Sequence, residues 1–229
     1  AGPLSEIDRK LVEAGALCHR DTGLALAIHT GDGTAALEIA VALSLESPDA
    51  VLVPTGDGVI LAGLGKGFRD LAGAGLIDHP PRLIAVQPAG SAAIVRGLSG
   101  GGAHAAVYAG ATSIADSLTV EVPRNAIGCL AEIASSKGSA VEVGDDLLRA
   151  SITRLASLTG VFAEPAGAAA LAGLQVALDR GLVDRGERVV LLITGSGLKD
   201  VAAATAALPR IEPVEPTLEA IERRVATGE

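Results

Sequence analysis

The sequence predicts an α/β protein with three layers, α/β/α, in which helices cover both faces of a mostly parallel sheet. Short apolar runs of strand length alternate with longer helix-type segments along the chain, and this alternation is typical of parallel sheets. The run VVLLI at residues 189–193 contains no polar residue. Such a run is expected of a central strand that is buried on both faces.

Start or stop signals mark several of the expected elements. The first helix begins after Ser5, a good N-cap residue, and Gly23 separates it from the strand LALAI. Pro165 favours a helix start, because proline fits the first helical turn. Strands are expected at residues 24–29, 50–54, 82–87, 118–121, 139–143 and 188–193. Helices are expected at residues 5–20, 33–45, 58–75, 91–97, 125–135, 145–159, 165–180 and 217–225.

Composition limits the classes of partner. The chain has 229 residues, a net charge of −9 and a pI near 4.9, so nucleic acid and anionic membranes are not expected as partners. Aromatic residues make up only 1% of the chain, which predicts a core of small aliphatic side chains. No apolar stretch approaches the roughly 20 residues of a transmembrane helix. Without a signal peptide, the expected location is the cytoplasm, with Cys18 and Cys129 as reduced, buried thiols.

Small and hydroxyl-bearing residues follow two of the expected strands. The string PTGDG places Thr55, Gly56, Asp57 and Gly58 between a strand and a helix. Glycines at such a turn allow backbone N–H groups to approach an anion, which the helix N-terminus also favours. The string TGSG, residues 194–197, follows the last strand. Because open α/β sheets bind ligands at the carboxyl ends of their strands, we expect a site there.

Four strings in order resemble threonine synthase and its relatives among the pyridoxal-phosphate enzymes of fold type II. Together they cover roughly residues 48–229. The resemblance implies the large domain of that fold, pyridoxal phosphate as cofactor, and a small amino-acid substrate. The implied activity is that of a lyase which eliminates or replaces the phosphate of O-phosphohomoserine. The strings lie at residues 54–97, 112–126, 160–174 and 186–200.

The resemblance also implies roles for individual residues in cofactor binding. Residues 55–58 would form the phosphate cup, and the Thr194 hydroxyl would bond the pyridine nitrogen of the cofactor. Ser196 would either assist or cap the following helix. Glu164 would lie near the cofactor ring or serve the helix dipole at a helix start. Asp57 stands where the family has an amide, and its charge would weaken the binding of a phosphate.

The lysine that holds the cofactor aldehyde as a Schiff base in the family is not found. In the family it lies near the N-terminus in a Ser-aromatic-Lys type context, which none of the four lysines of this chain has. No residue is therefore assigned a catalytic role, and Lys199 is expected to serve its turn together with Asp200. The lysine would come from another segment or subunit, either in a homodimer or as a lysine-bearing partner. The alternative is a non-catalytic, truncated or chimeric α/β domain.

The N-terminal segment leaves a further alternative open. Residues 4–38 resemble a unit of phosphotriesterase-like barrel hydrolases, in which His29 would bind a metal. The other histidines, His19, His79 and His104, show no recognisable ligand spacing, so no metal is expected. The same segment is equally consistent with a diverged strand and helix of the threonine synthase type. The division predicted is a helix-strand-helix unit at 1–47 and a cofactor-binding domain at 48–229.

Overall fold

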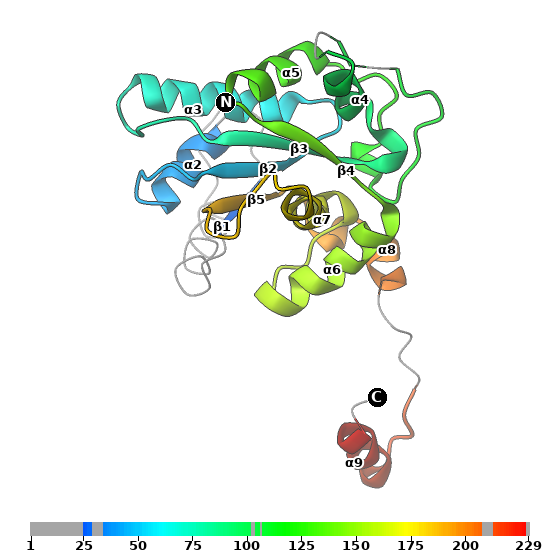
Figure 1. The fold of residues 1–229 in the computed structure, drawn as a ribbon. Coiled ribbons are helices and arrows are strands. Elements are labelled where there is room, and N and C mark those ends of the chain that lie inside the picture. Colours follow the sequence, from blue (N-terminus) through cyan, green and yellow to red (C-terminus); the bar gives the residue numbers. More distant parts are fainter. Residues whose placement is uncertain (1–24, 29–33, 102–103, 106, 208–212, 228–229) are drawn as a thin grey trace.

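A five-stranded parallel sheet forms the middle layer of the structure, a computed structural model that describes residues 25–28, 34–101, 104–105, 107–207 and 213–227. The strand order is β1-β5-β2-β3-β4, and every pair of neighbouring strands is parallel. Helices lie on both sides of this sheet (Figure 1), so the predicted three-layer α/β/α class is confirmed. The strands are β1 (Ala25–Ile28), β2 (Ala50–Pro54), β3 (Arg82–Pro88), β4 (Ser139–Val143) and β5 (Val189–Ile193).

The helices form one layer on each face of the sheet. One layer consists of α2 (Thr34–Ala42), α3 (Val59–Gly73), α4 (Ala93–Ser99) and α5 (Ala126–Ser135). The other layer consists of α7 (Pro165–Asp179), with α6 (Asp145–Thr159) and α8 (Val201–Ala206) packed outside it. The helix α9 (Leu218–Thr227) lies away from both layers in Figure 1. Short 3-10 turns occur at Ala89–Ser91 (η1), Asp116–Leu118 (η2) and Gly197–Lys199 (η3).

Side chains alternate between the two faces of the sheet and so divide the core in two. In β2, Val51 and Val53 belong to the cluster beneath α2, α3 and α5. Ala50 and Leu52 belong to the cluster that includes α7. This alternation follows from the two-residue period of a strand. Because both faces are covered, β2 and β5 are continuous apolar runs, as predicted for residues 189–193.

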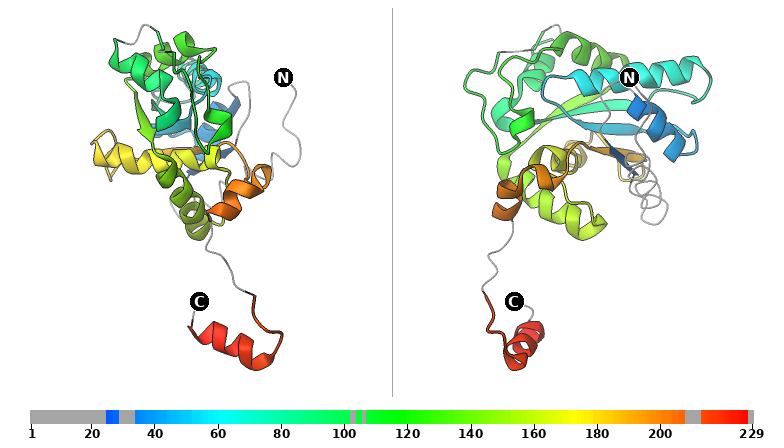
Figure 2. Two further views of the ribbon diagram at one scale, coloured as in Figure 1. Left: turned by 90° about the vertical axis from the view of Figure 1, so that its right-hand side faces the viewer. Right: turned by 180° about the vertical axis from the view of Figure 1, so that it is seen from behind.

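The helix α7 packs directly against the sheet, and the side chains that it buries are small. Figure 1 shows this helix end-on, and the left view of Figure 2 shows it lengthwise. A Cβ atom added at Gly173 would collide with the side chain of Val86 in β3. The predicted core of small aliphatic residues is therefore most evident here. The buried residues of α7 are Pro165, Ala166, Gly167, Ala168, Ala169, Ala170, Ala172, Gly173 and Ala177.

The predicted strand at residues 118–121 is wrong. The structure has the turn η2 at residues 116–118, followed by chain that pairs with no strand of the described sheet. The backbone there is satisfied by a side chain: Val120 N–H donates to the Ser91 hydroxyl over 2.8 Å. That hydroxyl in turn lies 3.2 Å from the Leu118 carbonyl oxygen. The hydroxyl of Ser91, from a distant turn, thus makes the hydrogen bonds that a neighbouring strand would make if residues 118–121 formed a strand.

The other predicted elements that fall on described residues lie within a few residues of those observed. Two helices cannot be matched in this way. The predicted helix at 5–20 lies outside the described residues. The helix α8 was not predicted, and it begins where the Asp200 carboxylate accepts a hydrogen bond from Ala203 N–H at 2.9 Å. No described helix is long and apolar enough to cross a membrane.

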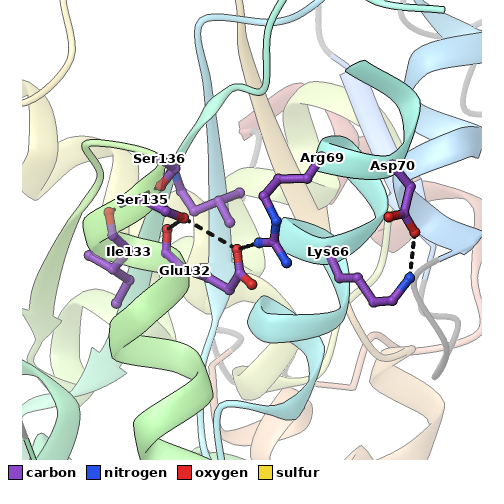
Figure 3. Close-up of polar contacts among 8 residues, drawn as sticks. Lys66, Arg69, Asp70, Glu132, Ile133, Ser135 and Ser136 are labelled. Atoms are coloured by element: carbon purple, nitrogen blue, oxygen red, sulfur yellow. Dashed lines mark hydrogen bonds and ion pairs between the residues drawn. The ribbon is translucent and has the colours of Figure 1, made fainter. Parts of the chain in front are cut away.

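A polar contact joins α3 to α5 on the outer surface of their layer. Arg69 of α3 forms an ion pair with Glu132 of α5, and the Ser135 hydroxyl lies near the same carboxylate (Figure 3). The Glu132 side chain is largely buried, whereas Arg69 is about half exposed. The pair links the helix that follows β2 to a helix more than fifty residues further along the chain. It therefore helps to fix the position of α3 beside α5.

Cys129, on the inner face of α5, is fully buried, as expected. Burial raises the pKa of its thiol from 9.0 to about 12, and the negative charge of Glu132 adds to the rise. The folded state therefore binds the thiol proton more tightly than the unfolded state does. It follows that Cys129 contributes stability below pH 9 that is lost as the pH rises toward 12.

We predict that this loss is measurable in urea unfolding. Between pH 8 and pH 10, the free energy of unfolding should fall by about 1.4 kcal/mol more in the natural protein than in the Cys129→Ala variant. The alanine variant is the control, because it keeps the other groups that titrate in this range. Equal losses in the two proteins would contradict the assignment to Cys129.

Candidate functional site

A cavity of about 250 Å³ opens at the carboxyl ends of β2 and β5. Parallel α/β sheets place their ligand sites at this edge. The cavity combines the turn after β2, the first turn of α3, the start of α7 and the turn after β5. Its lining residues are Pro54, Thr55, Gly56, Asp57, Gly58, Val59, Ile60, Leu61, Ser117, Leu118, Glu164, Thr194 and Lys199.

The turn after β2 presents backbone rather than side chains. Thr55 is buried, and its hydroxyl donates to the carbonyl oxygen of Val53, in the preceding strand, at 2.7 Å. Its backbone N–H donates to the Val86 carbonyl oxygen at 2.8 Å. Thr55 therefore anchors the turn to β3. The glycines that follow leave the backbone of the turn open to the cavity.

Gly58 is the N-cap of α3 and has the left-handed φ of 85°. A Cβ atom at this position would lie 2.7 Å from the Cβ atom of Cys129 in α5, so the site requires glycine. The N-cap has no side chain to bond the first N–H groups of the helix. Because those groups also lack partners inside a helix, they are available to an anion.

Asp57 has a defined partner outside the cavity. Its carboxylate oxygen accepts a hydrogen bond from Arg124 N–H at 2.9 Å. Its backbone carbonyl accepts one from Asn125 N–H at 3.0 Å. The residue thus ties the turn to the start of α5, a structural role that the sequence did not show. Its negative charge nevertheless stays in the lining of the cavity.

The turn after β5 places its two hydroxyls differently. Thr194 lines the cavity, and its hydroxyl has no hydrogen-bond partner within the part of the chain that the structure describes. Ser196 is exposed and lies outside the lining. Its hydroxyl accepts a hydrogen bond from Leu198 N–H at 3.3 Å, so it caps η3. The capping role considered for Ser196 is the one seen here.

The start of α7 is bonded to the turn after β5. Glu164 N–H donates to the Gly195 carbonyl oxygen at 3.1 Å, and Gly197 N–H donates to the Phe162 carbonyl oxygen at 3.0 Å. A side chain at Gly195 would collide with the carboxyl group of Glu164. These bonds hold the start of α7 against the end of β5. They thereby bring Glu164 into the same cavity as Thr194.

Glu164 and Lys199 form the charged pair of the cavity. The lysine Nζ lies 3.0 Å from a carboxylate oxygen of Glu164. Glu164 is the N-cap of α7, yet its side chain makes no capping hydrogen bond. Its carboxylate is therefore committed to the cavity and to Lys199 rather than to the helix N-terminus. Glu164 therefore lines the cavity at the start of α7, and its role near a cofactor ring stays a prediction.

The structure thus brings together every predicted cofactor-binding residue except Ser196, and it adds Lys199. We expected Lys199 to serve only its turn, but it reaches a carboxylate 35 residues away in sequence. His29 lies outside the described residues. Within the described ranges, no cluster of histidine, cysteine, aspartate or glutamate has the arrangement of a metal site.

Comparison with known proteins agrees with this geometry. Residues 6–195 match the family described as "Pyridoxal-phosphate dependent enzyme". The chain belongs to this family. The threonine synthase of Methanocaldococcus jannaschii is 34% identical over 193 residues, which are 84% of this chain and 48% of the relative. That of Mycobacterium bovis is 34% identical over 184 residues, 80% of this chain and 49% of the relative.

Two solved enzyme structures share the fold. A fungal L-serine ammonia-lyase from Rhizomucor miehei has a TM-score of 0.64 and 22% identity, covering 76% of this chain and 54% of that one. The pyridoxal-phosphate-bound threonine synthase from Brucella melitensis has a TM-score of 0.56 and 19% identity, covering 81% and 44%.

The comparisons bear on two of the expectations drawn from sequence. They confirm the resemblance to threonine synthases, although the chain spans about half the length of the curated relatives it matches. The family match also includes most of residues 4–38. No finding supports the likeness of that segment to barrel hydrolases. The boundary at residue 47 stays a prediction.

We predict that Gly58→Ala, at the N-cap of α3, destabilises the protein far more than a glycine-to-alanine change at the other end of this helix. The left-handed backbone and the contact with Cys129 should reduce the free energy of unfolding by about 1 to 3 kcal/mol in urea. Gly73→Ala, at the other end of the helix, is the matched control. An added Cβ there meets no atom within 4 Å, so that variant should be neutral or slightly more stable. Equal effects would refute the constraint at Gly58.

Proposed function

We propose that this chain carries the cofactor-binding part of a pyridoxal-phosphate-dependent amino-acid lyase of the threonine synthase type. Its substrate would be O-phosphohomoserine, from which phosphate is eliminated or replaced. One observation carries the proposal: a single cavity contains the N-terminus of α3, which has no side-chain cap, and the hydroxyl of Thr194, which has no hydrogen-bond partner among the described residues. The similarity to threonine synthases supports the choice of substrate. Cytoplasmic location is part of the proposal.

The residues of the cavity fit the two ends of the cofactor. The first turn of α3 offers N–H groups and the positive end of a 15-residue helix to the phosphate. The Thr194 hydroxyl would bond the pyridine nitrogen. When bound, pyridoxal phosphate supplies an electron sink for the substrate carbanion. A neutral hydroxyl at the ring nitrogen does not add a positive charge to the ring, which suits elimination and replacement.

The remaining groups of the cavity would orient the ring and adjust charge. Glu164 is largely buried at the start of α7, where its pairing with Lys199 balances its negative charge. The Schiff-base lysine of the family would be supplied by another segment or by a partner subunit. We therefore expect no threonine from O-phosphohomoserine when this chain is assayed alone.

A non-catalytic α/β domain is the second candidate. The small size of the cavity favours it, because about 250 Å³ lies below the roughly 300 to 1,000 Å³ of typical ligand pockets. Such a domain would retain the sheet and bind little or no cofactor. Binding of a cofactor analogue distinguishes the two candidates without requiring turnover.

The test is equilibrium dialysis with pyridoxamine 5′-phosphate, which has the phosphate and ring of the cofactor but no aldehyde. We predict saturable binding at one site per chain. Thr194→Val removes the hydroxyl and keeps the side-chain shape, so it should weaken binding by roughly 3- to 10-fold, the effect of one hydrogen bond. Ser196→Ala is the matched control and should leave binding unchanged, because that hydroxyl lies outside the cavity. Absence of saturable binding would favour the non-catalytic domain.

The charge of Asp57 gives an independent prediction. Asp57→Asn keeps an oxygen that can accept the hydrogen bond from Arg124 N–H, but it removes a negative charge from the phosphate cup. A unit charge about 4 Å from a phosphate in a solvated site contributes roughly 1 kcal/mol of repulsion, so the analogue should bind roughly fivefold more tightly. Pyridoxamine without phosphate is the control ligand and should show no such gain. Weaker phosphate binding by the variant would contradict the assigned cup.

A further inference from the structure

Lys199 has surroundings that set it apart from the other described lysines. It lines the cavity with the cup of residues 56–58 and with Thr194. Its side chain is 61% exposed, so the amine is accessible to a ligand that enters from solvent. Neither Lys66 nor Lys137 belongs to this lining. Among the lysines of the described ranges, Lys199 is therefore the one whose amine shares a cavity with the proposed phosphate cup.

We propose that Lys199 captures a phosphorylated aldehyde covalently in this cavity. The ligand class is an aromatic aldehyde that carries a phosphate, such as pyridoxal phosphate. The phosphate would occupy the cup at the start of α3, and the carbonyl carbon would react with Lys199 Nζ. This inference rests on the proposed function, because it requires the same cup to hold the phosphate. It adds a covalent attachment point that lies outside any Ser-aromatic-Lys context.

Glu164 provides the base that this reaction needs. An ammonium group cannot attack a carbonyl until it loses a proton, and the Glu164 oxygen lies 3.0 Å from Nζ. That distance is within the range for direct proton transfer. The Glu164 side chain is only 9% exposed and is positioned by the backbone bonds between α7 and the turn after β5. The acceptor is therefore held in place, while the lysine stays accessible.

The atoms of the reaction balance without any further reactant. Lys199 transfers a proton to Glu164, and the free amine nitrogen forms a bond to the aldehyde carbon. The amine then loses its second proton while the former carbonyl oxygen leaves as water, having gained two protons. Glu164 returns the proton that it accepted. The products are a carbon–nitrogen double bond and one molecule of water, and nothing is oxidised or reduced.

Lys66 is an internal comparison for this chemistry. It also forms an ion pair with a carboxylate, Asp70, one turn further along α3 (Figure 3). Its side chain is 69% exposed, which is slightly more than that of Lys199. Accessibility and a neighbouring carboxylate therefore predict equal reactivity at the two lysines. Only a phosphate held beside the amine, which raises the local concentration of the aldehyde, predicts selectivity for Lys199.

The experiment is reduction of the natural protein with borohydride in the presence of one equivalent of pyridoxal 5′-phosphate, followed by peptide mass mapping. We expect most of the label on Lys199, at least tenfold above Lys66. Lys199→Arg keeps the positive charge and should abolish the main label, whereas Lys66→Arg should leave it unchanged. Glu164→Gln should slow labelling while Lys199 stays the labelled residue. Circular dichroism checks that each variant is folded.

Two controls separate the outcomes. Pyridoxal without phosphate should lose the selectivity for Lys199, because nothing then holds the aldehyde beside the amine. Label spread evenly over the lysines, or concentrated on Lys10, Lys66, Lys137 or the α-amino group, would overturn the proposal. Saturable binding of pyridoxamine 5′-phosphate together with such a pattern would leave the proposed function standing and reject only the role of Lys199. Absence of both would reject the two together.

Discussion

The backbone hydrogen bonds between residues 162–164 and 195–197 are the constraint on which the site depends. They join the start of α7 to the turn after β5, two segments that are separated by the whole of α7. Through them, the carboxylate of Glu164 faces the amine of Lys199, and both border the cavity that Thr194 lines. A side chain at Gly195 would collide with the carboxyl group of Glu164 and displace it from its present position. A second tether, from Asp57 to the start of α5, fixes the opposite wall.

The sequence predicts the sheet well because burial on both faces leaves a simple signal. The strands β2 and β5 are continuous apolar runs, and the described strands lie within one residue of the predicted ones. The failure at residues 118–121 has a physical cause: an apolar run indicates burial, but not which group satisfies the backbone. Here the hydroxyl of Ser91 does so. The helix α8, which was not predicted, is short. Its start is marked by a single aspartate, Asp200, and in the sequence such a start resembles an ordinary turn.

Site residues are predictable where the backbone alone determines the site. The glycines of the cup and Thr194 follow strand ends, so parallel topology is sufficient to bring them together. Lys199 is different, because its neighbour Glu164 is set by tertiary contacts that leave no mark in the local sequence. Asp57 illustrates the same limit. Its charge could be recognised from the sequence, but its bond to the backbone of Arg124 could not.

The strand order has a consequence for how the protein reaches its native state. The strand β5 lies between β1 and β2, although it comes last in sequence among the described strands. The strands β2, β3 and β4 can pair as soon as they emerge from the ribosome, whereas β1 has to wait for a partner synthesised more than 150 residues later. Such non-local pairing slows folding. The turn that bears Thr194 and Lys199 is attached to this late strand, so the cavity is completed only when β5 inserts into the sheet.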